Sequence, residues 1–93
     1  MISTNEYFDG NVKSLGYTSA DGKSTIGVME KGSYEFGTSS HETMTVIEGI
    51  LEVKYVGEDS WISYGAGQSF EVKANSSFQV KTEGQSSYLC KYA

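Results

Sequence analysis

The chain of 93 residues has no proline, no arginine, one cysteine and one histidine. Without proline, its turns depend on eleven glycines, helped by Asn, Asp and Ser. Without arginine, no guanidinium group is available to clamp a phosphate through two parallel hydrogen bonds. An anion would therefore have to be held by lysine, hydroxyl or backbone N–H groups. Cys90 stands alone, which excludes an intrachain disulfide and fits a reducing cytoplasm.

Positive charge and long apolar runs are also scarce. Twelve acidic residues oppose seven lysines, which gives a net charge of −5. Nucleic-acid binding needs clustered positive charge, so this chain is a poor candidate for it. No stretch has the length of a transmembrane helix, and the first ten residues, with an acid at Glu6, do not resemble a signal peptide. We expect a soluble cytoplasmic protein that binds neither nucleic acid nor membrane.

Aromatic residues are plentiful by comparison. Seven Tyr, four Phe and one Trp supply large apolar groups for a core. A chain of this length makes one domain, and no linker or repeat divides it, so we expect a single domain over residues 1–93. Because so short a chain buries limited apolar surface, a closed barrel or a dimer interface would help it.

Apolar and polar residues alternate with period two through most of the chain, which is typical of β-strands. No helical period appears. Asp21-Gly22 is a strong hairpin signal between two such segments, and residues 1–10 are predicted to be a short initial segment with a turn at Asp9-Gly10. Strands are predicted at residues 12–18, 25–30, 33–38, 61–64, 69–72, 77–82 and 87–92, besides the central segment described next. This pattern predicts an all-β sandwich or barrel.

The central segment, residues 42–53, reads E-T-M-T-V-I-E-G-I-L-E-V. Met44 and Val46 share a face with Glu42, and the alternation resumes after Gly49. Glycine accepts the positive φ that a tight turn needs, so we predict a β-hairpin with Glu42 at the start of its inner face. A carboxylate on an apolar face is unusual because burying its charge is costly, so its presence there suggests a functional role. The alternative is an exposed carboxylate at a strand edge.

Several segments resemble a known family. Glu42, with Gly49 seven residues later and T-V-I-E-G leading into I-L-E-V, looks like the first conserved motif of the cupin superfamily. Together with N-E-Y-F-D-G-N-V-K-S-L-G-Y, G-V-M-E-K-G-S-Y-E-F-G-T and S-S-Y-L-C-K-Y, it is similar to the small single-domain pyrimidine/purine nucleoside phosphorylases, from Asn5 to Tyr92. The resemblance implies a small cupin-like β-barrel, a jelly roll, that splits nucleosides with phosphate into free base and α-D-ribose 1-phosphate.

The cupin resemblance also bears on metal binding. A metal-binding cupin places two histidines, one residue apart, shortly before the glutamate, and a third in its second motif. The corresponding positions here hold Phe36, Thr38 and, for the third, Phe78, none of which supplies the required ligand. His41 is adjacent to Glu42 and would face the opposite side of a strand. We expect no metal and no cofactor, with phosphate as a co-substrate.

In the same register, Phe36, Thr38, Met44 and Phe78 would line a cup beside the carboxylate of Glu42. A mostly apolar cup with a few polar groups suits a flat base and a sugar. An aromatic ring can stack on any nucleobase, which would permit broad substrate choice. Glu42 would accept hydrogen bonds from ribose hydroxyls or act on the base during cleavage. The alternative for the three apolar residues is ordinary core packing.

The segments at the two ends of the chain supply candidates for binding phosphate. Lys91 and Lys13 could contribute charge, and Tyr88 and Thr38 could contribute hydroxyl donors. The alternative for each lysine is a solvated surface charge. Nothing in the sequence near Cys90 activates its thiol, so we interpret this residue as a small core hydrophobe.

We therefore predict a nucleoside phosphorylase of broad specificity that forms a homodimer. Glu42 is its predicted catalytic residue, and the predicted substrate-binding residues are Phe36, Thr38, Met44, Phe78, Tyr88 and Lys91. Two alternatives stay open. One is a metal-free cupin that binds a small sugar or nucleotide without turnover. The other is an interaction protein whose aromatic surface, including Trp61 and Tyr64, contacts a partner.

Overall fold

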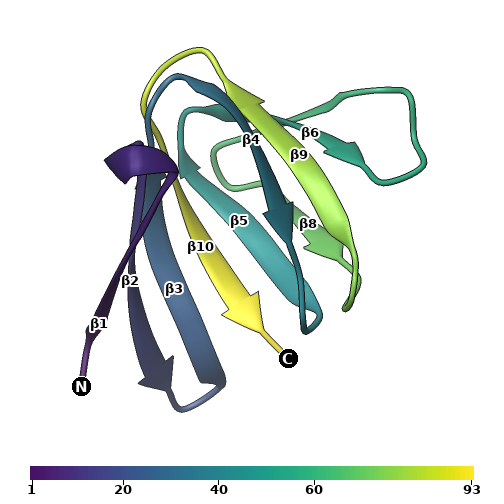
Figure 1. The fold of residues 1–93 in the computed structure, drawn as a ribbon. Coiled ribbons are helices and arrows are strands. Elements are labelled where there is room, and N and C mark those ends of the chain that lie inside the picture. The colour runs from purple at the N-terminus through teal and green to yellow at the C-terminus, as the bar shows by residue number, and fades with distance from the viewer.

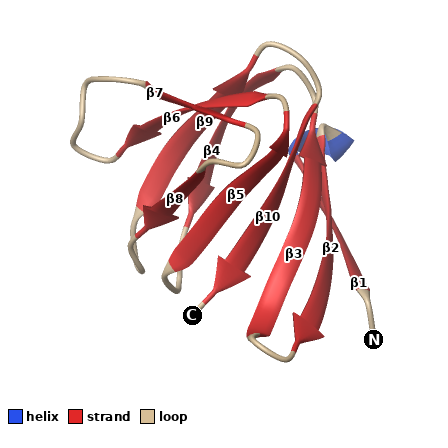
Figure 2. Ribbon diagram, turned by 180° about the vertical axis from the view of Figure 1, so that it is seen from behind, coloured by secondary structure: helices blue, strands red, loops and turns tan.

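The computed structural model describes residues 1–93 and consists almost entirely of β-strands (Figures 1 and 2). The elements in chain order are β1 (Ser3–Tyr7), the short 3₁₀ helix η1 (Phe8–Gly10), β2 (Val12–Ser19), β3 (Gly22–Met29), β4 (Gly32–Gly37), β5 (Glu42–Glu48), β6 (Ile50–Tyr55), β7 (Ile62–Gly65), β8 (Ser69–Val72), β9 (Ser77–Thr82) and β10 (Ser86–Tyr92). The predicted all-β class is confirmed. No helix of the structure has the length and apolar character needed to cross a membrane.

The strands form two antiparallel sheets. One has six strands in the order β1-β2-β3-β10-β5-β8, and the other has four in the order β4-β9-β6-β7. In Figure 2 the six-stranded sheet lies toward the viewer, with β4 and β9 behind it. No hydrogen-bonded ladder joins the two sheets, so they enclose the core as two facing layers without closing into one continuous barrel.

The core lies between the sheets. Thirteen buried hydrophobic residues form one cluster to which both sheets contribute. They are Val12, Met29, Tyr34, Met44, Val46, Leu51, Val53, Phe70, Val72, Phe78, Val80, Tyr88 and Cys90. Most follow the period-two alternation of their strands, as a sheet with one buried face requires.

The predicted hairpin over residues 42–53 is wrong. The strand β5 pairs with β10 and β8, whereas β6 pairs with β9 and β7, so the two strands belong to different sheets. Gly49, with φ +90°, turns the chain from one sheet into the other, and a Cβ there would overlap the Oγ of Ser86. The alternation and the glycine signal do predict two inward faces and a sharp turn. They do not determine which strand each one pairs with.

The N-terminal segment also differs from the prediction, because β1 is a strand that pairs along its length with β2. Its sequence, S-T-N-E-Y, is polar and largely exposed, as suits an edge strand that buries neither face. The turn predicted at Asp9-Gly10 lies within η1, where Phe8, Asp9 and Gly10 all have positive φ. The hairpin predicted at Asp21-Gly22 is confirmed, because β2 and β3 pair from Val12 and Met29 to the turn.

Candidate active site

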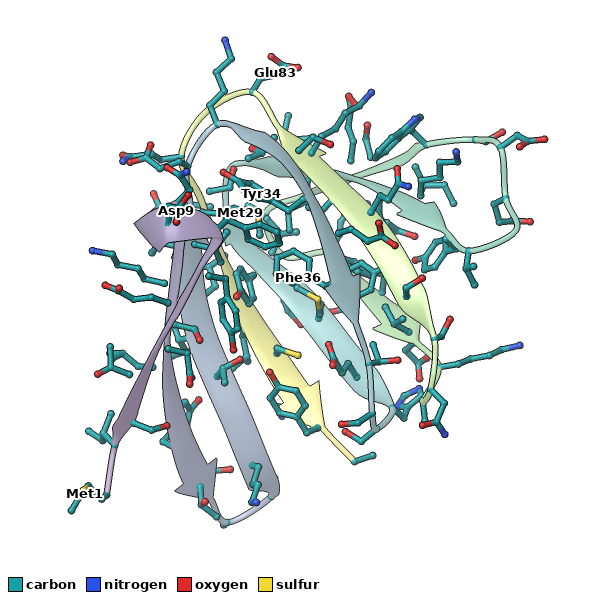
Figure 3. All side chains as sticks on the ribbon, in the orientation of Figure 1. Met1, Asp9, Met29, Tyr34, Phe36 and Glu83 are labelled. Carbon is teal, nitrogen blue, oxygen red and sulfur yellow. The ribbon has the colours of Figure 1, made fainter.

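A cavity of about 250 Å³ opens between the two sheets. Strands β2, β3, β5 and β10 form one side, β4 and β9 form the other, and the end of β1 with η1 forms an edge. Figure 3 shows Met29, Tyr34 and Phe36 extending toward the space between the sheets, whereas Met1 and Glu83 point away. The cavity lining is mostly hydrophobic, with nine of thirteen residues, as is usual for small-molecule sites.

Aromatic rings form one wall of the cavity. Phe36 of β4 stacks against Phe78 of β9, with ring centroids 5.7 Å apart. Phe8 of η1 meets Phe36 edge-on at 5.6 Å and lies 5.0 Å from Tyr34. Phe8 is held there by a positive φ of 54°, which is uncommon for a bulky residue. The wall offers ring faces and edges to a flat, apolar ligand.

Glu42 is one of two acids that line the cavity, with Glu35 of β4, and it lies where the alternation of β5 predicts. It pairs in register with Tyr92 of β10 and Val72 of β8, and it lies on the same face as buried Met44 and Val46. Burial raises the pKa of the Glu42 carboxyl group above its ordinary value, and a hydrogen bond from Cys90 and the nearby His41 oppose this less strongly. Glu42 can therefore carry a proton at a higher pH than an exposed glutamate.

The inner face of β10 presents a row of proton donors, Tyr88, Cys90 and Tyr92. Burial raises the pKa of both tyrosines and raises that of the Cys90 thiol to about 12, so all three stay protonated at neutral pH. The hydroxyl groups of Tyr92 and Thr25 lie 3.1 Å apart and share a hydrogen bond. A Cβ at Gly27 would overlap the Tyr88 ring, so this glycine makes room for the ring on the inner face of β3.

Five of the seven predicted site residues come together in the cavity: Phe36, Glu42, Met44, Phe78 and Tyr88. In each of their strands, side chains alternate between the two faces of the sheet as the sequence pattern predicts, and all five of these residues lie on the inward face.

The other two predicted site residues lie outside the cavity lining. The Thr38 hydroxyl donates to the carbonyl oxygen of Lys73 at 2.6 Å and accepts from the N–H group of Ser76, so it ties two loops together. Lys91 alternates with Cys90 and Tyr92 and thus points to the outer face of β10, where its Nζ lies 3.9 Å from Asp21. The alternation of residues along β10 already predicts that Lys91 points to the outer face.

Lys13, a candidate for binding phosphate, and His41, the neighbour of Glu42, also form their contacts outside the cavity lining. The Nζ of Lys13 lies 3.5 Å from Glu6, and both side chains are exposed. His41 Nε2 lies 2.9 Å from Oε1 of Glu71. No three His, Cys, Asp or Glu side chains gather closely enough to hold a metal ion.

Sequence reasoning did not assign several cavity residues to the site. Cys90 and Tyr92 share the parity of Tyr88, so the alternation of β10 could have placed them there. Ser14 is two residues after buried Val12 on β2, so the same alternation predicts that it lies on the inner face. Tyr7 and Phe8 reach the cavity through the edge strand β1 and the turn after it. No periodic signal marks these two, because their segment buries neither face.

Comparisons with known proteins give the family and the fold of the chain. A protein of Vibrio cholerae serotype O1 named pyrimidine/purine nucleoside phosphorylase is 51% identical over 92 residues, which cover 99% of this chain and 97% of that protein. A crystal structure of a protein of unknown function from Vibrio parahaemolyticus, 46% identical, superposes with a TM-score of 0.97 over 100% of this chain and 99% of the other.

More distant solved structures show the fold alone. A cupin superfamily protein from Desulfitobacterium hafniense, 15% identical, gives a TM-score of 0.72 over 92% of this chain and 80% of that one, which confirms the cupin-like fold. The family model described as pyrimidine/purine nucleoside phosphorylase matches residues 2–92. The chain therefore belongs to the pyrimidine/purine nucleoside phosphorylase family.

Proposed function

We propose that the chain is a nucleoside phosphorylase of broad specificity, which splits purine and pyrimidine nucleosides with phosphate into free base and α-D-ribose 1-phosphate. Its family membership gives the reaction class. The observation in the structure that supports it is the half-buried carboxyl group of Glu42, which shares one cavity with an aromatic wall. The cavity thus combines a surface for a base with a group that can exchange a proton.

The proposed chemistry uses these groups in one displacement. A phosphate oxygen attacks C1′ of the ribose, the C1′–N bond breaks, and its electron pair leaves with the base. Glu42 gives its proton to the departing base and regains one from hydrogen phosphate, so the proton count balances. In this scheme the carboxylate formed in between stabilises positive charge on the sugar ring.

Base recognition by stacking explains broad specificity. The faces and edges of Phe36 and Phe78 do not distinguish a purine from a pyrimidine. Stacking on such rings depends on the π-face that every base has, whereas discrimination needs hydrogen bonds to particular base edges. A wall of Phe residues therefore suits a site that accepts several nucleosides.

Phosphate has to be held without a cation from the cavity lining, which contains no lysine. The hydroxyl donors that line it are Ser14 and the tyrosines, and Tyr88 remains protonated because burial raises its pKa. Ser14 accepts a hydrogen bond from Asn5 at 3.3 Å, which leaves its own O–H free to donate. We assign the phosphate to the Ser14 and Tyr88 side of the cavity.

We further propose that the enzyme works in the cytoplasm, as a homodimer, and with no cofactor besides the co-substrate phosphate. The outer face of the six-stranded sheet supports the dimer, because Leu15, Ile26 and Val28 leave 50%, 43% and 49% of their surface exposed. Leu15 and Ile26 are direct neighbours across β2 and β3. Contiguous apolar patches on a protein surface often mark interaction sites.

Chromatography of free base tests the proposal. The protein is incubated with uridine, adenosine or guanosine, with and without phosphate. We expect each base to appear only when phosphate is present, and we expect Glu42→Gln to abolish its release. Glu48→Gln, on the exposed end of the same strand, is the matched control and should keep full activity. Base release that ignores phosphate would contradict the phosphorylase.

The absence of a cation from the cavity favours one alternative, a binding module for a small sugar or nucleotide that catalyses no reaction. In that case thermal stability should rise with the concentration of nucleoside, with no base released and no dependence on phosphate. The same samples, followed by thermal unfolding, distinguish the two functions.

A further inference from the structure

The cavity contains a buried thiol that the proposed reaction does not use directly. Cys90 lies on the inner face of β10, between Thr25 of β3 and Met44 of β5 in the register of the sheet, and is 2% exposed. Its Sγ donates a hydrogen bond to Oε1 of Glu42 at 3.4 Å. Because burial and the neighbouring carboxylate raise the pKa of the thiol to about 12, it remains a donor rather than a nucleophile at neutral pH.

We propose that Cys90 is a positioning residue, whose S–H group holds Oε1 of Glu42 and fixes the carboxyl group against the cavity wall. The inference rests on the proposed function for its link to turnover. Its physical basis is separate, because the hydrogen bond joins neighbouring strands at Glu42, the one acid of β5 that lines the cavity.

The other groups around Glu42 explain why a thiol suits this place. From β10 it is faced by Tyr88 and Tyr92, while His41 directly precedes it in the chain. The remaining ionisable residues of the cavity are Tyr7 and Glu35. None of the cavity residues is a lysine, which would form an ion pair and keep the carboxylate ionised.

A neutral S–H group is a weak donor that orients the carboxylate without locking it in the charged state. The acid can then both lose and regain a proton during turnover, while its position stays fixed. A hydroxyl group at the same place would keep the donor, and a methyl group would remove it.

The matched pair Cys90→Ala and Cys90→Ser tests this role, since the two variants differ only in the hydroxyl donor. We expect Cys90→Ala to lower kcat by about two- to tenfold, as the loss of one neutral hydrogen bond implies, and Cys90→Ser to regain most of that loss. The limb of the pH–rate profile that Glu42 controls should move to higher pH in Cys90→Ala, because a donor to the carboxylate is gone. It should lie at or below the parent position in Cys90→Ser.

Thermal unfolding of both variants shows whether a change in activity merely follows lost stability. A direct readout comes from the NMR titration of the Glu42 carboxyl carbon, assigned with Glu42→Gln, which needs no turnover. A higher midpoint in Cys90→Ala than in Cys90→Ser supports the inference. Equal midpoints in the parent and both variants overturn it.

The two proposals fail in different ways. If the parent releases no base, the phosphorylase is wrong, and the carboxyl titration still decides whether Cys90 holds Glu42. If the parent is active, Glu42→Gln is inactive and the two Cys90 variants share the parent's pH profile and kcat, then only the role of Cys90 is wrong.

Discussion

At the scale of single residues, Glu42 combines two requirements that oppose each other. In the proposed reaction it acts on a base inside an apolar cavity, and burial in that cavity penalises its charged form. The structure eases this conflict with one weak donor from Cys90 and with partial exposure of the carboxyl group. The result is a carboxyl group whose pKa is raised above its ordinary value, chiefly by burial.

This raised pKa makes a prediction for stability. A carboxyl group whose folded pKa exceeds its unfolded value binds its proton more tightly in the folded state, so its contribution to stability is fully present at low pH and is lost as the pH rises through the folded pKa. We therefore expect Glu42→Gln to gain stability over the parent as the pH rises, and to lose that advantage in acid. Thermal unfolding between about pH 4 and pH 8 measures this. A constant difference across the range would contradict it, and Glu48→Gln serves as the exposed control.

Phe36 makes a second prediction at this scale. It is partly buried and stacks on Phe78 in the cavity wall. If it stacks on the base, Phe36→Ala should raise KM by about 5- to 150-fold, corresponding to ~1–3 kcal/mol of base stacking, and by similar factors for uridine and adenosine. Phe36→Leu keeps apolar volume without a ring face and should show most of the same loss. Unchanged KM values in both variants would mean that Phe36 serves only the core.

The sequence predicts the position of a site residue when the alternation along its strand determines which face of the sheet the side chain lies on. Glu42, Met44 and Phe78 lie where the alternation of their strands places them. The charge of Lys91 and its segment suggest phosphate binding, but Lys91 alternates with Tyr88 along β10, and its side chain lies on the outer face near Asp21. Thr38 has the inward parity, but its hydroxyl group bonds to loop backbone that no sequence pattern reveals.

At the scale of elements, the corner at Gly49 determines how the cavity is built. It ends β5 in one sheet and begins β6 in the other, so the chain passes between the two layers within a single residue. Short-range signals predict the turn and both inward faces. The partners of each strand depend on contacts with β8, β9 and β10, which are distant in sequence, and this is why the corner could be mistaken for a hairpin.

Gly49→Ala tests the corner. The backbone there has φ +90°, and a Cβ would overlap Ser86 of β10, so both strain and a clash oppose any side chain. We expect a loss of about 1–3 kcal/mol in the free energy of unfolding, measured by chemical denaturation. Gly84→Ala is the control, because a Cβ there meets no heavy atom within 4 Å, and it should change stability by less than about 0.5 kcal/mol. If both substitutions lowered the free energy of unfolding by the same amount, the corner at Gly49 would have no special role in stability.

At the scale of the whole molecule, a domain of this size has limited apolar surface to bury, and it leaves some of that surface exposed. The inner faces of the two sheets form one core. The outer face of the six-stranded sheet carries Leu15, Ile26 and Val28 in solvent. In a two-fold symmetric dimer, this patch of one subunit would pack against the same patch of the other, so both copies would be buried.

The proposed homodimer is tested by light scattering after size-exclusion chromatography. We expect the parent to have the mass of a dimer and Ile26→Lys to have that of a monomer, because a lysine in the apolar patch would bury a charge without a partner in the interface. Ile62→Lys is the matched control, since Ile62 is exposed to the same degree, 44% against 43%, but lies on β7 of the other sheet. A dimer that survives Ile26→Lys but dissociates in Ile62→Lys would place the interface on the four-stranded sheet. A monomeric parent would contradict the homodimer and show that the patch does not mediate self-association.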